Sequence, residues 1–264
     1  MLTLTHVSLA TVEELFRYKA DGFTLEAFPG YTDDQWGIKA HNRPWIDEVG
    51  DFRSGQKVIE VGGAFSLLPK YLSDRYGVES WIADDFGASS GETVWSRWGD
   101  PSLLPGRYPT LNYTFEKFGT FSDRHPTAYF DRIFTVSTLE HIPQQERLDV
   151  IRDMNRCLKP GGRQMHTIDI EIPAIRRCLL ASLADRVQCS SALLDRFRSE
   201  MSRWILTFRA TGIQISARVP DAMLLLSRST LVESPDVVYT CYPPNNSAKS
   251  YCPTASLLMI VEDL

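Results

Sequence analysis

The chain has 264 residues, of which 43% are hydrophobic and 23% are charged, values typical of a soluble globular protein with room for one large core. The formal net charge of −5 and the absence of a basic run longer than Arg176-Arg177 argue against a general nucleic-acid binder, because phosphate-backbone affinity needs clustered Lys and Arg. No apolar stretch approaches the roughly 20 residues that span a bilayer. The start of the chain also lacks a signal-peptide pattern. We therefore expect a cytoplasmic protein without nucleic-acid or membrane partners.

The cysteines are scattered and form no CxxC pair, which is typical of reduced thiols and not of a disulfide frame or a zinc site. They are Cys157, Cys178, Cys189, Cys241 and Cys252. The sequence therefore predicts no structural metal.

Residues 1–50 are interpreted as an N-terminal cap. A helix with an apolar stripe is expected from Val12, and a short helix over 45–49 with Pro44 at its start. The stretch between them is rich in proline, glycine and aromatic residues. Two interpretations of its aromatic side chains stay open, packing against the main domain or a lid over a substrate pocket; they are Tyr31, Trp36, His41 and Trp45.

From Gly55 onward, apolar strand patterns alternate with helical patterns. Strands are predicted at 57–61, 79–83, 110–115, 131–137 and 163–170, and helices at 66–76 and 144–158. Such alternation indicates a parallel sheet that is covered by helices on both faces.

The turn after the first of these strands has the sequence KVIEVGGAFSLLP over 57–69. A buried strand that passes through glycines into a helix presents backbone N–H groups and a positive helix end at one point. That arrangement suits a nucleotide-like cofactor. The long loop over 84–110, with Trp95 and Trp98, is a candidate wall of the active site.

Residues 174–211 are predicted to be helical again and to lie on the substrate side. Further strands are expected at 213–219, 237–242 and 256–261, and Asp221 is expected to cap a helix that continues to Leu231.

Three sequence motifs, in this order along the chain, resemble those of a known family. They are VIEVGG at 58–63, the acids in WIADD at 81–85, and FDRIFTVSTLEHIP at 130–143 followed by LKPGGR at 158–163. Over residues 55–170 the chain resembles the class I, Rossmann-like S-adenosylmethionine-dependent methyltransferases. The resemblance implies a mostly parallel seven-stranded sheet with helices on both faces. The domain organisation would be a cap or lid at 1–50 and a methyltransferase domain at 51–264, with 174–211 as a helical insertion.

The resemblance also implies the cofactor contacts. Glu60, an acid inside an apolar strand, would bind the ammonium of S-adenosylmethionine, and Gly62 and Gly63 would let the cofactor approach the backbone. Asp84 would bind the ribose hydroxyls, with Asp85 as the fallback. The alternatives are a Glu60 that binds backbone N–H groups of its own loop, and acids that cap a helix.

Two further positions follow from the same resemblance. Glu116 would meet the adenine amino group, and Ser137 would lie at the backbone that contacts the methionine part. The later glycines of the family pattern are replaced here by Ala64 and Ser66. The absence of these two glycines argues against a nicotinamide dinucleotide as the cofactor, because its binding needs the tighter glycine turn.

His141 is the candidate general base, because imidazole accepts a proton near neutral pH. The alternative is a structural histidine within its loop. Asp169, near the end of the strand over 163–170, would orient a substrate amine or hydroxyl, or is an ordinary loop carboxylate.

The expected activity is transfer of a methyl group to O, N or C of a small organic acceptor, as in secondary metabolism, with S-adenosylhomocysteine as the product. A nucleotide-binding dehydrogenase and a non-catalytic subunit with a degenerate cofactor site are the competing interpretations. The oligomeric state is left open.

Overall fold

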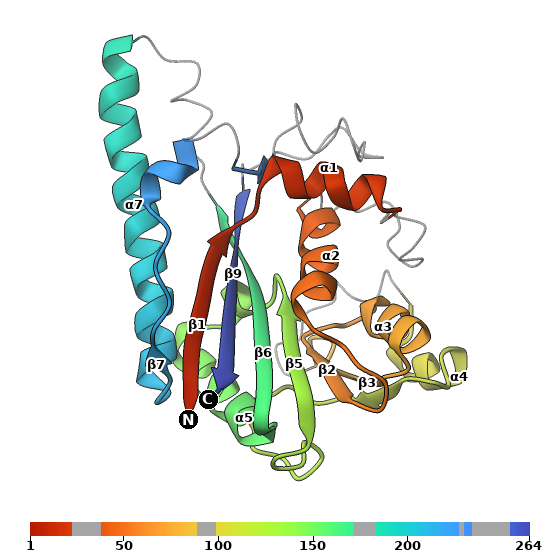
Figure 1. Ribbon diagram of the computed structural model, residues 1–264. Coiled ribbons are helices and arrows are strands. Elements are labelled where there is room, and N and C mark those ends of the chain that lie inside the picture. The colour runs from red at the N-terminus through yellow and green to blue at the C-terminus, as the bar shows by residue number, and fades with distance from the viewer. Residues whose placement is uncertain (23–37, 89–98, 172–182, 227–229, 234–253) are drawn as a thin grey trace.

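A computed structural model (Figure 1) describes residues 1–22, 38–88, 99–171, 183–226, 230–233 and 254–264. At its centre is a sheet with the strand order β4-β3-β2-β5-β6-β9-β1-β7, and β8 pairs with β9 off this path. The strands are β1 (Leu2–Leu9), β2 (Lys57–Val61), β3 (Glu79–Ala83), β4 (Asn112–Thr114), β5 (Phe130–Val136), β6 (Leu158–Glu171), β7 (Gln214–Ile215), β8 (Val232–Glu233) and β9 (Thr254–Asp263).

The strands from β4 to β6 in this order are parallel, and β9 runs antiparallel between β6 and β1. This mostly parallel arrangement confirms the predicted Rossmann-like fold. The helices are α1 (Val12–Ala20), α2 (Lys39–Val49), α3 (Leu68–Tyr76), α4 (Leu104–Arg107), α5 (Gln144–Cys157) and α7 (Leu183–Ala210), with short 3₁₀ turns η3 (Pro101–Leu103), η4 (Leu139–His141) and η5 (Ala222–Leu226).

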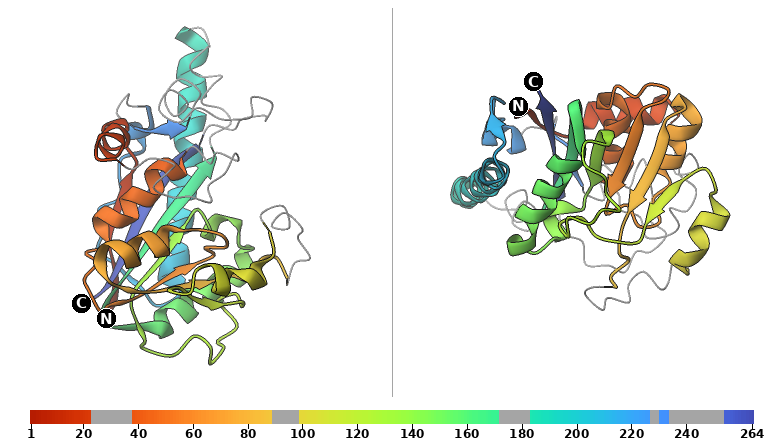
Figure 2. Two further views of the ribbon diagram at one scale, coloured as in Figure 1. Left: turned by 90° about the vertical axis from the view of Figure 1, so that its right-hand side faces the viewer. Right: turned by 90° about the horizontal axis from the view of Figure 1, so that it is seen from below.

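Helices cover both faces of the sheet, as Figure 2 shows. Side chains of α1, α2 and α3 form one core with Val58, Phe134 and Leu258. Side chains of α5 and α7 form the other core with neighbours of these residues such as Ile59 and Ile133. Successive side chains of a strand point to opposite faces, so each central strand supplies both cores and is nearly all apolar.

The N-terminal strand β1 is the main departure from the sequence prediction. It lies inside the sheet, paired antiparallel with β9 on one side and parallel with β7 on the other. Leu4, Val7 and Leu9 are buried. The sheet therefore has more than the predicted seven strands, and residues 2–9 belong to it. No apolar periodicity signals a partner as distant in sequence as β9, so the strand was not predicted from the residues alone.

The remaining differences concern lengths. The helix predicted over 45–49 begins at Lys39, so Pro44 lies inside α2. The strand predicted from residue 163 begins at Leu158, directly after α5. Asp221 does cap through its carboxylate, which accepts from the backbone N–H of Met223 at 2.9 Å, but it opens the short η5 turn. Predictions for Trp95, Trp98, Tyr31, Trp36 and the strand at 237–242 fall outside the described residues.

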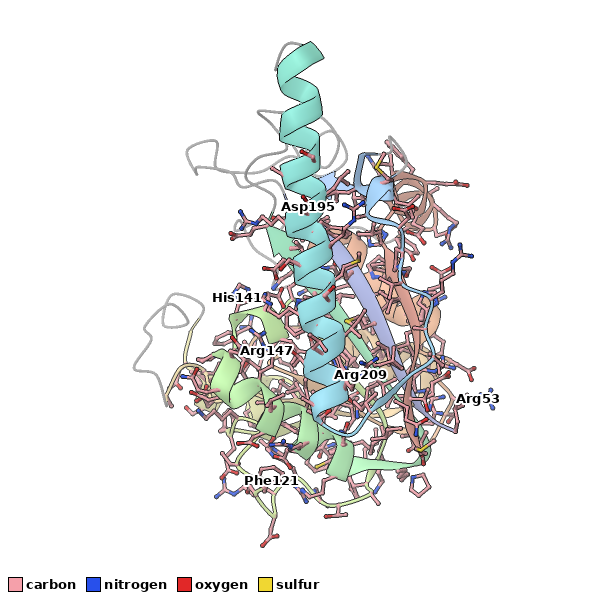
Figure 3. All side chains as sticks on the ribbon, turned by 90° about the vertical axis from the view of Figure 1, so that its left-hand side faces the viewer. Arg53, Phe121, His141, Arg147, Asp195 and Arg209 are labelled. Atoms are coloured by element: carbon pink, nitrogen blue, oxygen red, sulfur yellow. The ribbon has the colours of Figure 1, made fainter. Side chains whose placement is uncertain are left out.

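The two ends of the described chain lie side by side (Figure 1), where the N-terminal amine donates to the Leu264 carbonyl at 2.7 Å. At the opposite end of the sheet, α7 projects beyond the strands (Figure 3). Within the described segments, no helix has the length and apolarity that membrane crossing requires.

Candidate active site

The turns that follow β2, β3, β5 and β6 meet at one edge of the sheet, because these strands are parallel and their carboxyl ends lie together. α2 packs on β5 and β6 beside this edge. Three non-glycine residues in these turns have a positive φ, namely Ala64 (42°), Phe86 (52°) and Ser137 (48°). Such backbone is costly for residues with a Cβ and clusters at functional sites.

Glu60 lies inside β2 with 2% of its surface exposed. Burial raises the pKa of its carboxyl, while the nearby Arg43 guanidinium and a hydrogen bond from Ser66 oppose that rise. Its Oε2 atom is buried, and no residue that the structure describes donates a hydrogen bond to it. A buried carboxylate oxygen without a donor is unfavourable, so the site fits a ligand that supplies an N–H or O–H group.

Arg43 is a functional candidate that sequence reasoning missed. Its side chain, on α2, is 3% exposed, and burial lowers its pKa to about 9 despite the favourable charge of Glu60. A buried cation beside a buried anion matches the two charged ends of an amino acid. The sequence signal was weak, since Arg43 stands in a segment without clear periodicity.

The glycine turn is built for close packing. Gly62 has a φ of +73°, and a Cβ there would lie 2.1 Å from Cγ2 of Thr138. A Cβ on Gly63 would lie 3.0 Å from Cγ of Glu60. Gly62 is therefore required by its backbone conformation and by Thr138, whereas a side chain at Gly63 would crowd Glu60; contact of either glycine with a cofactor stays a prediction.

The departures from the family pattern are accommodated locally. Ala64 adopts the left-handed backbone that a glycine would take more easily. The Ser66 hydroxyl accepts from the Leu68 backbone N–H at 3.3 Å, at the start of α3, in addition to its bond with Glu60. Both residues are thus compatible with the turn that this chain forms.

Asp84 follows β3 and binds the backbone of two turns. One carboxylate oxygen accepts from the N–H of Ala64 at 3.0 Å, and the other accepts from the N–H of Phe86 at 2.6 Å. Burial nonetheless raises the pKa of Asp84 to about 6. Each carboxylate oxygen has a second acceptor position. Asp84 can therefore hold its turn and also bind a ribose, whereas the Asp85 carboxylate accepts from Gly87 N–H at 3.0 Å.

Glu116 lies at the end of β4 and forms an ion pair with Arg124 at 3.2 Å. Beside it are aromatic rings in mutual contact, those of Phe65, Phe86, Tyr113 and Phe115. Phe115 is 41% exposed. An exposed aromatic side chain in this cluster suits stacking with a planar base, and the contact of Glu116 with adenine stays a prediction.

Ser137, Asn42 and Asp169 form a hydrogen-bonded group over β5 and β6. The Asn42 amide nitrogen donates to Oγ of Ser137 at 3.1 Å and to Oδ1 of Asp169 at 3.0 Å. Ser137 in turn binds the Asp169 carboxylate through its hydroxyl. Glu140 completes the group, because its Oε1 atom accepts from the Asp169 backbone N–H at 3.0 Å.

Glu140 and Asp169 thus place two carboxyl groups side by side. Burial, and then the charge of Asp169, raise the pKa of Glu140 to about 8. Burial also raises the pKa of Asp169, against the lowering effect of Lys39. Two neighbouring carboxyl groups disfavour the doubly ionised state, so Glu140 keeps its proton to a higher pH than an isolated carboxyl would. Sequence reasoning singled out Asp169 but not its partner.

His141 ends η4, and its side chain is exposed (Figure 3). It lies close enough to Asp169 to lower the pKa of that carboxyl. The base role of His141 stays a prediction, and Glu140, one residue earlier, is the more buried proton acceptor.

Arg147 on α5 holds the η4 turn in place (Figure 3). Its guanidinium donates to the carbonyls of Leu139 at 3.0 Å and Ile142 at 2.8 Å, and lies 4.3 Å from the ring centre of Trp204 on α7. The turn that carries Glu140 and His141 is therefore tied to two helices.

Residues 110–165 match the family model described as a methyltransferase domain, from the segment of β4 through β5, η4 and α5 into β6. The strand order of the sheet is that of the class I, Rossmann-like methyltransferase fold. The match and the strand order confirm the resemblance that the motifs indicated. No curated protein matches the sequence.

Several solved structures are similar to this chain. One is a geranyl diphosphate methyltransferase with its substrate and sinefungin, at 10% identity and a TM-score of 0.46, covering 86% of this chain and 77% of that one. A second is phosphoethanolamine N-methyltransferase 2 of Haemonchus contortus with S-adenosylmethionine, at 12% identity and a TM-score of 0.41, covering 96% of this chain and 57% of that one.

A third is the 1,6-didemethyltoxoflavin-N1-methyltransferase of Burkholderia thailandensis with S-adenosylhomocysteine, at 13% identity and a TM-score of 0.37. The similarity covers 59% of this chain and 60% of that one. Similarity at this level carries no argument about the acceptor of this chain.

Proposed function

We propose that the chain is an S-adenosylmethionine-dependent methyltransferase that acts on a small organic acceptor. The observation that carries the proposal is Glu60, a buried carboxylate just before the turn between β2 and α3. One of its oxygens has no hydrogen-bond donor among the described residues, and Arg43 lies beside it. When bound, S-adenosylmethionine supplies an electrophilic methyl group on a sulfonium.

The residues of the site suit the parts of this cofactor. Glu60 would hold the ammonium and Arg43 the carboxylate, as charge-assisted contacts. Asp84 would bind the ribose and the Phe86–Phe115 surface the adenine, with Glu116 at its edge. Ser137 would place the turn after β5 against the methionine part. Alignment and exclusion of water are then the main catalytic contributions of the protein.

The surrounding elements would form the acceptor pocket. In this proposal α1 and α2 belong to the cap expected over 1–50, and α7, which lies within the segment expected over 174–211, forms another wall. Their aromatic and apolar content supports a partly apolar acceptor, as in secondary metabolism.

Calorimetry with S-adenosylmethionine and S-adenosylhomocysteine tests the proposal. We expect micromolar binding of both, and loss of at least tenfold in affinity for Glu60→Gln, which removes the charge but keeps the shape. Absence of binding by the wild-type chain, with a protein partner recovered instead, would favour the non-catalytic subunit. The replacement of two family glycines by Ala64 and Ser66 makes that outcome worth measuring.

A further inference from the structure

The Glu140–Asp169 pair lies outside the groups that the proposed cofactor contacts require. Its carboxyl groups come from different strand ends, Glu140 from the η4 turn after β5 and Asp169 from the end of β6. The bond from Asp169 N–H to Glu140 holds the two together. The pair therefore results from the fold and not from adjacency in sequence.

Two unpartnered acceptor atoms lie at this pair. The Asn42 side chain is fully buried and donates to Asp169 and Ser137 through its nitrogen, yet none of the described residues donates a hydrogen bond to its Oδ1 atom. The Glu140 Oε2 atom is likewise buried and has no donor among these residues. Buried acceptors of this kind are normally satisfied, so they indicate a ligand that carries several N–H or O–H donors.

Three basic side chains of the described residues act on the pair. Lys39 from α2 acts on Glu140 and Asp169 but also on Glu60. His141 from η4 faces Asp169, and Arg147 from α5 faces Glu140 while it donates to backbone carbonyls. Within the part of the chain that the structure describes, Lys39 is thus shared among three carboxyl groups. Within the described residues, no group of three or more His, Cys, Asp or Glu side chains is arranged to hold a metal.

We propose that the Glu140–Asp169 pair binds the methyl acceptor through a cationic nitrogen, so that the acceptor is a primary or secondary amine. This inference rests on the proposed function. An ammonium supplies the donors that Asn42 Oδ1 and Glu140 Oε2 lack, and two carboxyl groups reject an anionic acceptor.

The same contact prepares the nucleophile. An ammonium N–H bond breaks, the proton moves to Glu140 Oε2, and the nitrogen keeps the electron pair. Glu140 becomes a neutral acid, and the amine becomes a neutral nucleophile for the methyl group of the cofactor. A carboxyl that titrates near neutral pH suits this role.

The test uses sets of shape-matched fragments, aryl-alkyl amines, the corresponding alcohols and the corresponding carboxylates, with ligand-observed NMR on the full chain in EDTA. We expect the amines to bind selectively, and their affinity to fall at least tenfold in Glu140→Gln and in Asp169→Asn. The matched control is Glu146→Gln, which removes an exposed carboxylate on α5 that pairs with Lys117. Amine binding should also strengthen between pH 6 and 8, as Glu140 loses its proton.

Preference for alcohols or carboxylates, absence of binding in all three classes, or amine binding that both variants retain would overturn the inference. Calorimetry with S-adenosylhomocysteine separates this result from the proposed function. We expect Glu140→Gln and Asp169→Asn to bind it within about twofold of wild type. If wild type does not bind it, the proposed function fails, whatever the amines do; if it binds while the amines fail, the amine assignment alone fails.

Discussion

The buried carboxyl of Glu140 makes the stability of the protein depend on pH. The pKa of its carboxyl is raised from 4.5 to about 8, so the folded state binds its proton more tightly than the unfolded state does. The stability that this proton provides is complete below about pH 4.5 and is lost as the pH rises through about 8.

Glu140→Gln should therefore stabilise the protein at pH 8–9, where the wild type holds a buried charge. We expect a melting temperature about 2–4 °C above wild type, which corresponds to about 1 kcal/mol in a chain of this size, and a smaller difference at pH 5. Thermal unfolding across this pH range measures it. A difference that does not depend on pH would show that the pair carries no raised pKa.

Asp84 has a structural and a proposed binding role, and both can be measured. Asp84→Ala should weaken cofactor affinity about tenfold or more through loss of charge-assisted bonds, and should also destabilise the two turns by about 1–3 kcal/mol. Asp85→Ala, which removes a bond to Gly87 within its own turn, is the comparison. Calorimetry with S-adenosylhomocysteine measures the binding; equal affinity for wild type and Asp84→Ala would remove the ribose role.

His141 and Glu140 compete for the role of base. If His141 is the base, His141→Ala should lower turnover about 10²-fold or more with little change in cofactor affinity. Comparison of pH–rate profiles of His141→Ala and Glu140→Gln assigns the role, because the variant that lacks the base also lacks the corresponding limb of the profile. Unaltered turnover in His141→Ala would leave the histidine a structural residue.

At the scale of elements, Arg147 couples α5 and α7 to the η4 turn. Arg147→Ala leaves the carbonyls of Leu139 and Ile142 without their charged donor, so we expect a loss of about 1.5–3 kcal/mol in the free energy of unfolding. Arg152→Ala, on the exposed face of the same helix, should cost less than about 1 kcal/mol. Urea unfolding of the two variants makes the comparison, and equal losses would contradict the coupling.

Elements with a strong local signal were predicted well. The strands over 57–61 and 79–83 have the predicted bounds, because each is a short apolar run between turn residues. The long α5 likewise follows its apolar spacing. The burial of Glu60 and the glycine turn after its strand follow from local sequence, whereas their contact with a cofactor stays a prediction. Asn42, Arg43 and Glu140 were missed, because their partners come from distant segments.

At the scale of the whole molecule, β1 joins β7 to the rest of the sheet, because it pairs with β9 on one side and with β7 on the other. Leu4 is fully buried there, so Leu4→Ala should destabilise the protein by about 2–5 kcal/mol. His6→Ala, an exposed position on the same strand, should cost less than about 0.5 kcal/mol. Chemical denaturation of both variants measures the difference. A small loss for Leu4→Ala would mean that β1 contributes little to the sheet.

The sequence by itself determined the class of fold and the place of the glycine turn after β2, because periodicity, glycines and the LEHIP and LKPGGR runs are local properties of the chain. Only the tertiary structure decided the insertion of β1 beside β9, the burial of Arg43 beside Glu60, and the meeting of Glu140 with Asp169. Each of these joins segments far apart in sequence, and what brings them together is the shared carboxyl edge of parallel strands and the packing of α2 on β5 and β6.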